Sequence, residues 1–110
     1  MKEERRPWGN FKQFVLNQKC TVKIIEVKPF QKLSLQVHKK RDENWYFLTC
    51  GKVQIGNIKR RVKKGELVVI KKNVPHRACA GWKKVRFLEV SFGTFNEKDE
   101  VRLEDKYNRK

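Results

Sequence analysis

Short stretches rich in β-branched and aromatic residues recur roughly every 8 to 12 residues along this chain, with turn residues between them. Residues 21–27 are rich in Val and Ile, and residues 33–38 alternate apolar and polar side chains. Further strands are expected at residues 45–50, 53–62, 66–70 and 85–90. The second of these contains Gly56-Asn57, which predicts a hairpin turn. No amphipathic helix is evident, so the 110 residues predict an all-β sandwich or small barrel with one core.

The sequence is expected to form one domain, residues 1–110, with an N-terminal arm of about residues 1–19. A C-terminal segment of about residues 96–110 is mostly polar, and its few apolar residues predict that it is pinned across the barrel. No apolar run approaches the roughly 20 residues that span a bilayer, and the charged N-terminus lacks the apolar region of a secretory signal. Three scattered cysteines argue against a disulfide framework or a zinc knuckle, so we expect a cytoplasmic protein with reduced thiols.

The net charge of +16, from 28 Lys and Arg against 12 Asp and Glu, favours an anionic partner or a lysine-rich surface that maintains solubility. Basic clusters fall mostly where strands are expected to end, which favours the second interpretation. The clusters are residues 39–41, 59–61, 63–64, 71–72 and 83–84. No RNA-binding motif is present, so nucleic acid and membrane are not expected as partners. The tryptophans are expected in the core or at an interface rather than as a stacking platform; they are Trp8, Trp45 and Trp82.

Four side chains form the most informative set for chemistry. Gln36 and His38 lie two residues apart on an expected strand and therefore share a face. Glu43 follows across a turn, and His76 begins a later strand. Two imidazoles, a carboxylate and an amide suit zinc, manganese, iron or nickel. The alternative is that the two histidines are ordinary surface or core residues.

The sequence around this set resembles the first cupin motif in the form carried by type II phosphomannose isomerases. The stretches that carry the resemblance are PFQKLSLQVH at 29–38, RDENW at 41–45, RPWG at 6–9, VPHR at 74–77 and VRLEDKYNR at 101–109. They occur in the family's order. That family forms the C-terminal part of bifunctional mannose-1-phosphate guanylyltransferases and also occurs as a stand-alone domain.

The resemblance implies a single cupin, a small barrel of two antiparallel sheets, that interconverts mannose 6-phosphate and fructose 6-phosphate with a divalent metal. The implied metal ligands are Gln36, His38, Glu43 and His76. The implied catalytic residues are Lys40, Glu89 and Arg102, and the implied substrate-binding residues are Arg86 and Arg102. Lys40 is expected on the same strand face as His38. The resemblance and the apolar faces of residues 33–37 and 45–48 also imply a homodimer.

Several positions depart from the family's pattern. Lys40 replaces the second histidine, Asn44 replaces the histidine before Trp45, and Phe30 replaces a glycine. Asn73 stands at a turn glycine, where asparagine tolerates left-handed backbone angles. These departures leave open a cupin that binds an anionic sugar or sugar nucleotide without this catalysis. A basic nucleic-acid-binding barrel is a third alternative, which depends on charge alone.

Overall fold

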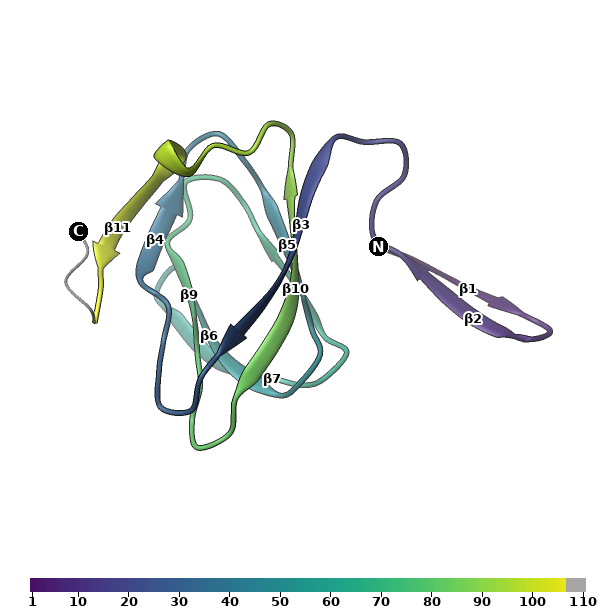
Figure 1. The fold of residues 1–110 in the computed structure, drawn as a ribbon, viewed down its shortest axis with the longest axis horizontal. Coiled ribbons are helices and arrows are strands. Elements are labelled where there is room, and N and C mark those ends of the chain that lie inside the picture. Colours follow the sequence, from purple (N-terminus) through teal and green to yellow (C-terminus); the bar gives the residue numbers. More distant parts are fainter. Residues whose placement is uncertain (107–110) are drawn as a thin grey trace.

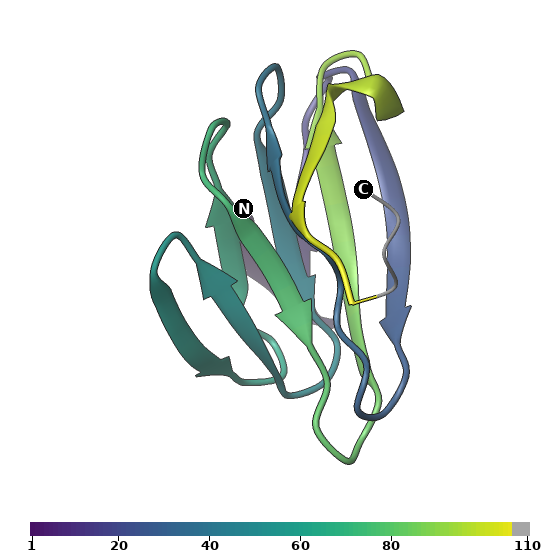
Figure 2. The ribbon, with the colours of Figure 1, turned by 90° about the vertical axis from the view of Figure 1, so that its left-hand side faces the viewer.

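The protein, described by a computed structural model over residues 1–106, is a barrel of two antiparallel sheets that face each other (Figures 1 and 2). In sheet order, the first sheet consists of β3 (Cys20–Val27), β10 (Val85–Phe92), β5 (Glu43–Phe47) and β8 (Leu67–Ile70). The second consists of β11 (Glu100–Glu104), β4 (Leu35–His38), β9 (His76–Cys79), β6 (Gly51–Ile55) and β7 (Ile58–Val62). A single 3-10 turn, η1 (Glu97–Asp99), precedes β11. The predicted all-β barrel is confirmed.

The inner face of the barrel changes from apolar to polar along its length. Strand alternation turns Trp45 and Phe47 of β5 inward, where both are fully buried against Phe87 of β10. At the other end of the same two strands, Glu43 and Ser91 also point inward and are buried. The polar end therefore carries the candidate site. Because Trp45 and Phe47 belong to the core, only Tyr46 and Leu48 of the stretch 45–48 can contribute to the apolar outer surface expected of it.

Three turns depend on backbone angles that favour glycine. The β6–β7 hairpin turns at Gly56, which has φ +60°, as the sequence predicts. Asn73 has φ +67°, which confirms that it occupies a left-handed position in place of glycine. Phe30 also has a left-handed angle, φ +62°, while its ring is exposed. The left-handed angle explains why the family pattern has a glycine at this position.

Both ends of the described chain contain strands that the sequence patterns did not locate. Strands β1 (Lys2–Arg6) and β2 (Gly9–Gln13) pair as a hairpin that stands away from the barrel (Figure 1). At the other end, β11 pairs with β4 at the edge of the five-stranded sheet. Tyr107, expected in that segment, lies outside the described residues. No helix among residues 1–106 has the length and apolar character needed to cross a membrane.

Replacement of Phe30 tests the left-handed turn. A non-glycine residue at this angle costs about 1 kcal/mol or more, and the exposed ring buries little surface. We expect Phe30→Gly to raise the free energy of unfolding in urea by about 0.5–1 kcal/mol. Phe30→Val should lower it, because β-branched side chains tolerate this angle least. A loss of stability in Phe30→Gly would contradict this account.

Candidate metal centre

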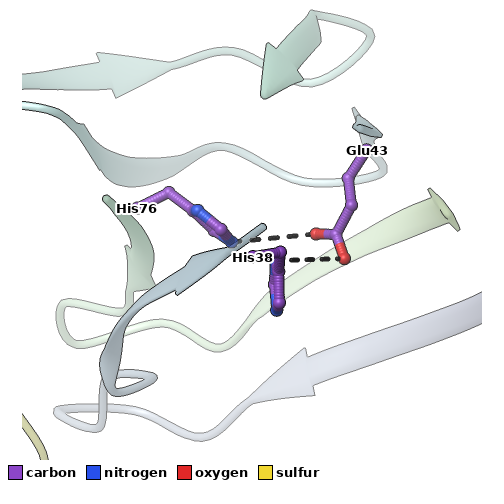
Figure 3. Close-up of side chains that lie close together, drawn as sticks. All are labelled: His38, Glu43 and His76. Carbon is purple, nitrogen blue, oxygen red and sulfur yellow. Dashed lines mark ion pairs between the residues drawn. The ribbon is translucent and has the colours of Figure 1, made fainter. Parts of the chain in front are cut away.

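Three buried side chains from different strands meet inside the polar end of the barrel (Figure 3). They are His38 at the end of β4, Glu43 at the start of β5 and His76 at the start of β9. One ligand atom from each lies within 4.8 Å of the others. Each residue is at most 2% exposed. The structure thus brings together three of the four predicted ligands.

His76 presents an unprotonated nitrogen to the centre of this cluster. Its Nδ1 lies 2.9 Å from the carbonyl oxygen of Val74, and because a carbonyl only accepts, Nδ1 carries the proton. Nε2 is therefore a lone-pair acceptor, 3.8 Å from Oε1 of Glu43 and without a hydrogen-bond partner within residues 1–106. Burial is the largest cause that lowers the pKa of His76, which favours the neutral ring.

A buried lone pair that faces a carboxylate oxygen is unfavourable unless a cation or a proton lies between them. A backbone carbonyl that fixes the tautomer of a histidine is also the usual support of a metal-binding imidazole. The residues present therefore fit a divalent metal ion. Glu43, Nε2 of His76 and one nitrogen of His38 would hold it.

Glu43 is the most strongly bound group in the cluster. Its Oε1 accepts from Trp45 Nε1 at 3.1 Å, and its Oε2 accepts from Arg41 Nε at 2.9 Å and from Ser91 Oγ at 3.2 Å. Burial acts to raise the pKa of Glu43, but His38, Arg41 and His76 outweigh it, so the pKa is lowered. The carboxylate is consequently charged and held in one orientation.

Arg41 is a site residue that the sequence analysis did not single out. Its guanidinium is buried, stacks on Phe95 at 4.4 Å from the ring centroid, and donates from Nη2 to Nε2 of His38 at 2.9 Å. His38 therefore presents its Nδ1–H toward Glu43, at 3.6 Å from Oε2. A metal that used Nε2 of His38 would have to displace this guanidinium. The sequence offered one indication of this role. Arg41 lies two residues before Glu43, next to an expected strand, where the two side chains can share a face.

A cavity of about 360 Å³ opens beside the cluster. Its lining carries both charges, and consists of Lys23, Gln36, His38, Arg41, Glu89, Phe95, Lys98, Glu100 and Arg102. Gln36 pairs in register with His76, and its side-chain amide lies against the carboxylate of Glu100, to which the nitrogen can donate. Gln36 therefore lies beside the centre as a cavity residue, and its role as the fourth ligand stays a prediction.

Two of the predicted catalytic residues line this cavity. Arg102 of β11 forms an ion pair with Glu100, at 3.1 Å from Nε to Oε2. Glu89 of β10 is buried, and burial, followed by the charge of Glu43 and a hydrogen bond with it, raises the pKa of Glu89 to about 8. Lys23, which the sequence analysis missed, faces Glu89 in the β3–β10 register. The sequence indication for Lys23 was its spacing. Lys23 lies two and four residues before Ile25 and Val27, which point inward, so strand alternation places Lys23 on the same inner face.

The structure does not bring two other predicted residues into the cavity. Strand β4 ends at His38, because the carboxylate of Asp99 accepts from the backbone amides of Lys39 and Lys40. Lys40 is therefore exposed in a bend, and the expectation that it shares the strand face of His38 is wrong. Arg86 lies on the outer face of β10, 3.6 Å from Glu26, because its parity is opposite to that of Glu89.

Comparisons with known proteins agree with this geometry. The family model described as "Mannose-6-phosphate isomerase C-terminal" matches residues 1–105. XanB, a xanthan biosynthesis protein of Xanthomonas campestris, is 35% identical over 107 residues, which cover 94% of this chain. The mannose-1-phosphate guanylyltransferase ManC of Salmonella typhimurium is 32% identical over 113 residues, which cover 98%. The chain spans only 23% of the length of each.

A solved structure shows the same fold. A protein of Klebsiella pneumoniae with a double-stranded β-helix domain aligns with 82% of this chain and 78% of its own. The TM-score is 0.68 at 20% sequence identity. The predicted cupin barrel is therefore confirmed.

Replacement of Arg41 tests how the buried carboxylate is balanced. We expect Arg41→Gln to lower the free energy of unfolding of the metal-free protein by about 3 kcal/mol, because Glu43 loses its buried ion pair. Zinc should stabilise this variant more than the wild type for two reasons. The ion replaces the positive charge lost with Arg41, and it does not have to compete with the guanidinium for Glu43 and His38. Thermal unfolding with and without zinc measures both effects.

Arg86→Gln is the matched control, because this exposed pair with Glu26 should contribute less than about 1 kcal/mol. Equal stabilisation of the wild type and Arg41→Gln by zinc would show that the guanidinium does not compete with the ion.

Proposed function

Because the chain belongs to the mannose-6-phosphate isomerase C-terminal family, we propose that it is a metal-dependent isomerase of mannose 6-phosphate and fructose 6-phosphate. The observation that carries the proposal is the buried set of His38, Glu43 and His76, with a lone pair of His76 aimed at a charged carboxylate. A bound divalent ion would polarise the sugar's carbonyl and hydroxyl oxygens.

Charged side chains at the cavity mouth suit a sugar phosphate. Arg102 offers a planar fork that matches phosphate oxygens, and Lys23 and Lys98 line the same cavity. The volume of about 360 Å³ is in the range of small-molecule sites. We assign phosphate binding to Arg102, assisted by these two lysines.

Isomerisation requires a group that moves a proton between C1 and C2 of the sugar. Glu89 is the inward-facing carboxyl group of β10 that lines the cavity beside Glu43. In the proposed reaction the carboxylate form of Glu89 removes the proton from C2 of the aldose and returns it to C1, and the C2 hydroxyl proton passes to the carbonyl oxygen. Because the pKa of Glu89 is raised to about 8, the carboxylate form increases, and turnover should rise, as the pH rises toward 8. Lys40 and Arg86 have no part in this assignment, because their side chains do not line the cavity.

The proposed compartment is the cytoplasm. The three cysteines are free in the structure, which suits a reducing environment.

An assay with added zinc, manganese, iron or nickel tests the isomerase. We expect turnover of mannose 6-phosphate with at least one of these metals and about a 100-fold or greater loss of kcat in Glu89→Gln. Arg102→Lys keeps the charge but removes the fork, so it should raise KM for the sugar phosphate. Glu26→Gln, on the outer face of β3, should retain activity. Turnover that is insensitive to Glu89→Gln would remove Glu89 from the mechanism.

A second candidate is a cupin that binds an anionic sugar without turning it over. The observation that favours it is Arg41, which already balances Glu43 and engages Nε2 of His38 without a metal. In that case calorimetry should detect binding of mannose 6-phosphate to metal-free protein. No added metal would then give turnover.

We also propose a homodimer that pairs the outer faces of the four-stranded sheets. Side chains on that face form two cross-strand rows. One row is Ile24, Leu88, Tyr46 and Leu67, and the other is Val22, Val90, Asn44 and Val69. Val22, Ile24 and Val69 are each about half exposed. Val90 is already buried and Phe14 already packs on Tyr46, so the part of this face that suits burial against a second copy is the exposed set of Val22, Ile24 and Val69.

Light scattering at micromolar concentration should give twice the chain mass of 13.2 kDa. Ile24→Glu places a charge in the centre of the proposed interface and should give monomers. Val101→Glu, an equally drastic change on the outer face of the other sheet, should leave the mass unchanged. A monomeric wild type would overturn the proposal.

A further inference from the structure

A groove of about 390 Å³ crosses the outer face of the five-stranded sheet, on strands β9, β6 and β7. Its lining is strongly basic and consists of Lys32, Lys52, Val53, Gln54, Lys59, Arg60, Arg61, Arg77 and Cys79. It shares no residue with the cavity beside the metal centre. The sugar-phosphate chemistry proposed above therefore does not account for it.

Strand register gathers these cations. Lys52 lies opposite Arg61, and Gln54 lies opposite both Lys59 and Arg77. Lys52, Lys59 and Arg61 therefore lie on one outer patch. Carboxylates balance only part of the charge. Arg77 pairs with Glu104 at 3.1 Å, and Arg60 pairs with Glu66.

Lys52, Lys59 and Arg61 form no ion pair with a carboxylate in the described part of the chain. Like charges held this closely repel one another, and an anionic ligand would relieve the repulsion. The groove therefore presents at least three cations to an anionic partner.

A second hollow, of about 310 Å³, continues the groove, since Lys52 and Arg61 line both. Its lining includes Trp82, which belongs to the loop between β9 and β10. That loop lies at the end of the barrel opposite to η1 (Figures 1 and 2). Trp82 is 75% exposed, and Lys83 Nζ lies 5.0 Å from its ring centroid. The core role expected of the tryptophans therefore holds for Trp45 but not for Trp82, for which an interface role stays a prediction.

We propose that this surface binds single-stranded nucleic acid, with a base stacked on Trp82 and backbone phosphates held by Lys52, Lys59 and Arg61. An aromatic platform beside a basic groove is the combination that such binding needs. A duplex keeps its bases stacked inside, so it could use the cations but not the indole.

The arrangement favours a strand over a free nucleotide. The cations extend along the groove from the Lys52–Arg61 pair to Lys59, two residues further from Trp82, and Lys83 adds charge at the ring itself. The phosphates of a single nucleotide lie next to one another and could not contact all of these cations at once, whereas the backbone of a strand could. The hollow beside Trp82 is lined by Cys50, Gly51, Lys52, Arg61, Gly81, Lys83 and Val85, so it offers no side-chain carboxylate or amide to read a base edge. Binding should therefore tolerate any sequence.

Fluorescence anisotropy of a labelled oligodeoxythymidylate of about 12 nucleotides tests the proposal. We expect Trp82→Ala to weaken binding by about 5-fold to 150-fold. The matched control is Trp8→Ala, which removes an indole that is equally exposed, at 73%, on the β1–β2 hairpin. This control should leave the affinity unchanged.

Salt dependence tests the cations. Paired replacement of Lys52 and Arg61 by Gln should reduce the slope of log affinity against log salt by about 1.4. Replacement of Lys71 and Lys72 by Gln removes the same charge from an exposed turn between β8 and β9, and should reduce the slope less.

Four results would overturn the proposal. They are no binding of the oligonucleotide at low salt, equal losses from the two tryptophan variants, equal effects of the two charge variants, and binding of ADP as tight as that of the oligonucleotide. The third would mean diffuse attraction, and the fourth would mean a site for a free nucleotide. Circular dichroism of each variant separates lost binding from lost fold. None of the residues substituted in these tests lines the cavity beside the metal centre, so the isomerase activity proposed above should be the same in every variant.

Discussion

The polar end of the barrel depends on one buried charge, the carboxylate of Glu43. A charge without solvent is stable only if donors or cations surround it on every side. Here they come from both sheets: Trp45 and Ser91 belong to the four-stranded sheet, and the two histidines belong to the five-stranded sheet. Glu43 thus joins the sheets electrostatically where the apolar core ends.

Arg41 extends this constraint to the C-terminal segment. Besides Glu43 and His38, its guanidinium donates to the carbonyl oxygen of Asn96 and stacks on Phe95. These contacts hold the connection between β10 and η1 at the mouth of the cavity. Glu100 and Arg102 of β11 then follow on the cavity wall. The arginine that compensates the buried carboxylate also positions the residues to which we assign phosphate binding.

Much of this arrangement could be predicted from the sequence because local rules decide it. Strand alternation located the inward residues Gln36 and His38, and turn chemistry located Gly56 and Asn73. Strand alternation predicts Lys40 on the same face as His38, but Lys40 lies in an exposed bend. The cause is a distant carboxylate, Asp99, which accepts from two backbone amides and ends β4 at His38. The orientation of Gln36 and the burial of Arg41 likewise depend on partners more than 50 residues away, Glu100 and Asn96. No local pattern contains these contacts.

The net charge of +16 is distributed over two different sites, the cavity beside the metal centre and the groove on the outer face of the five-stranded sheet. In the cavity, four cationic side chains lie among Glu89 and Glu100 and beside the charged Glu43, so carboxyl groups offset part of the positive charge. Such a site recognises a phosphate by geometry, through the fork of Arg102. On the outer groove, Lys52, Lys59 and Arg61 form no ion pair with a carboxylate within residues 1–106. Attraction there is long-ranged and sensitive to salt, which suits a flexible polyanion, and the indole of Trp82 supplies the short-ranged contact that charge alone cannot give.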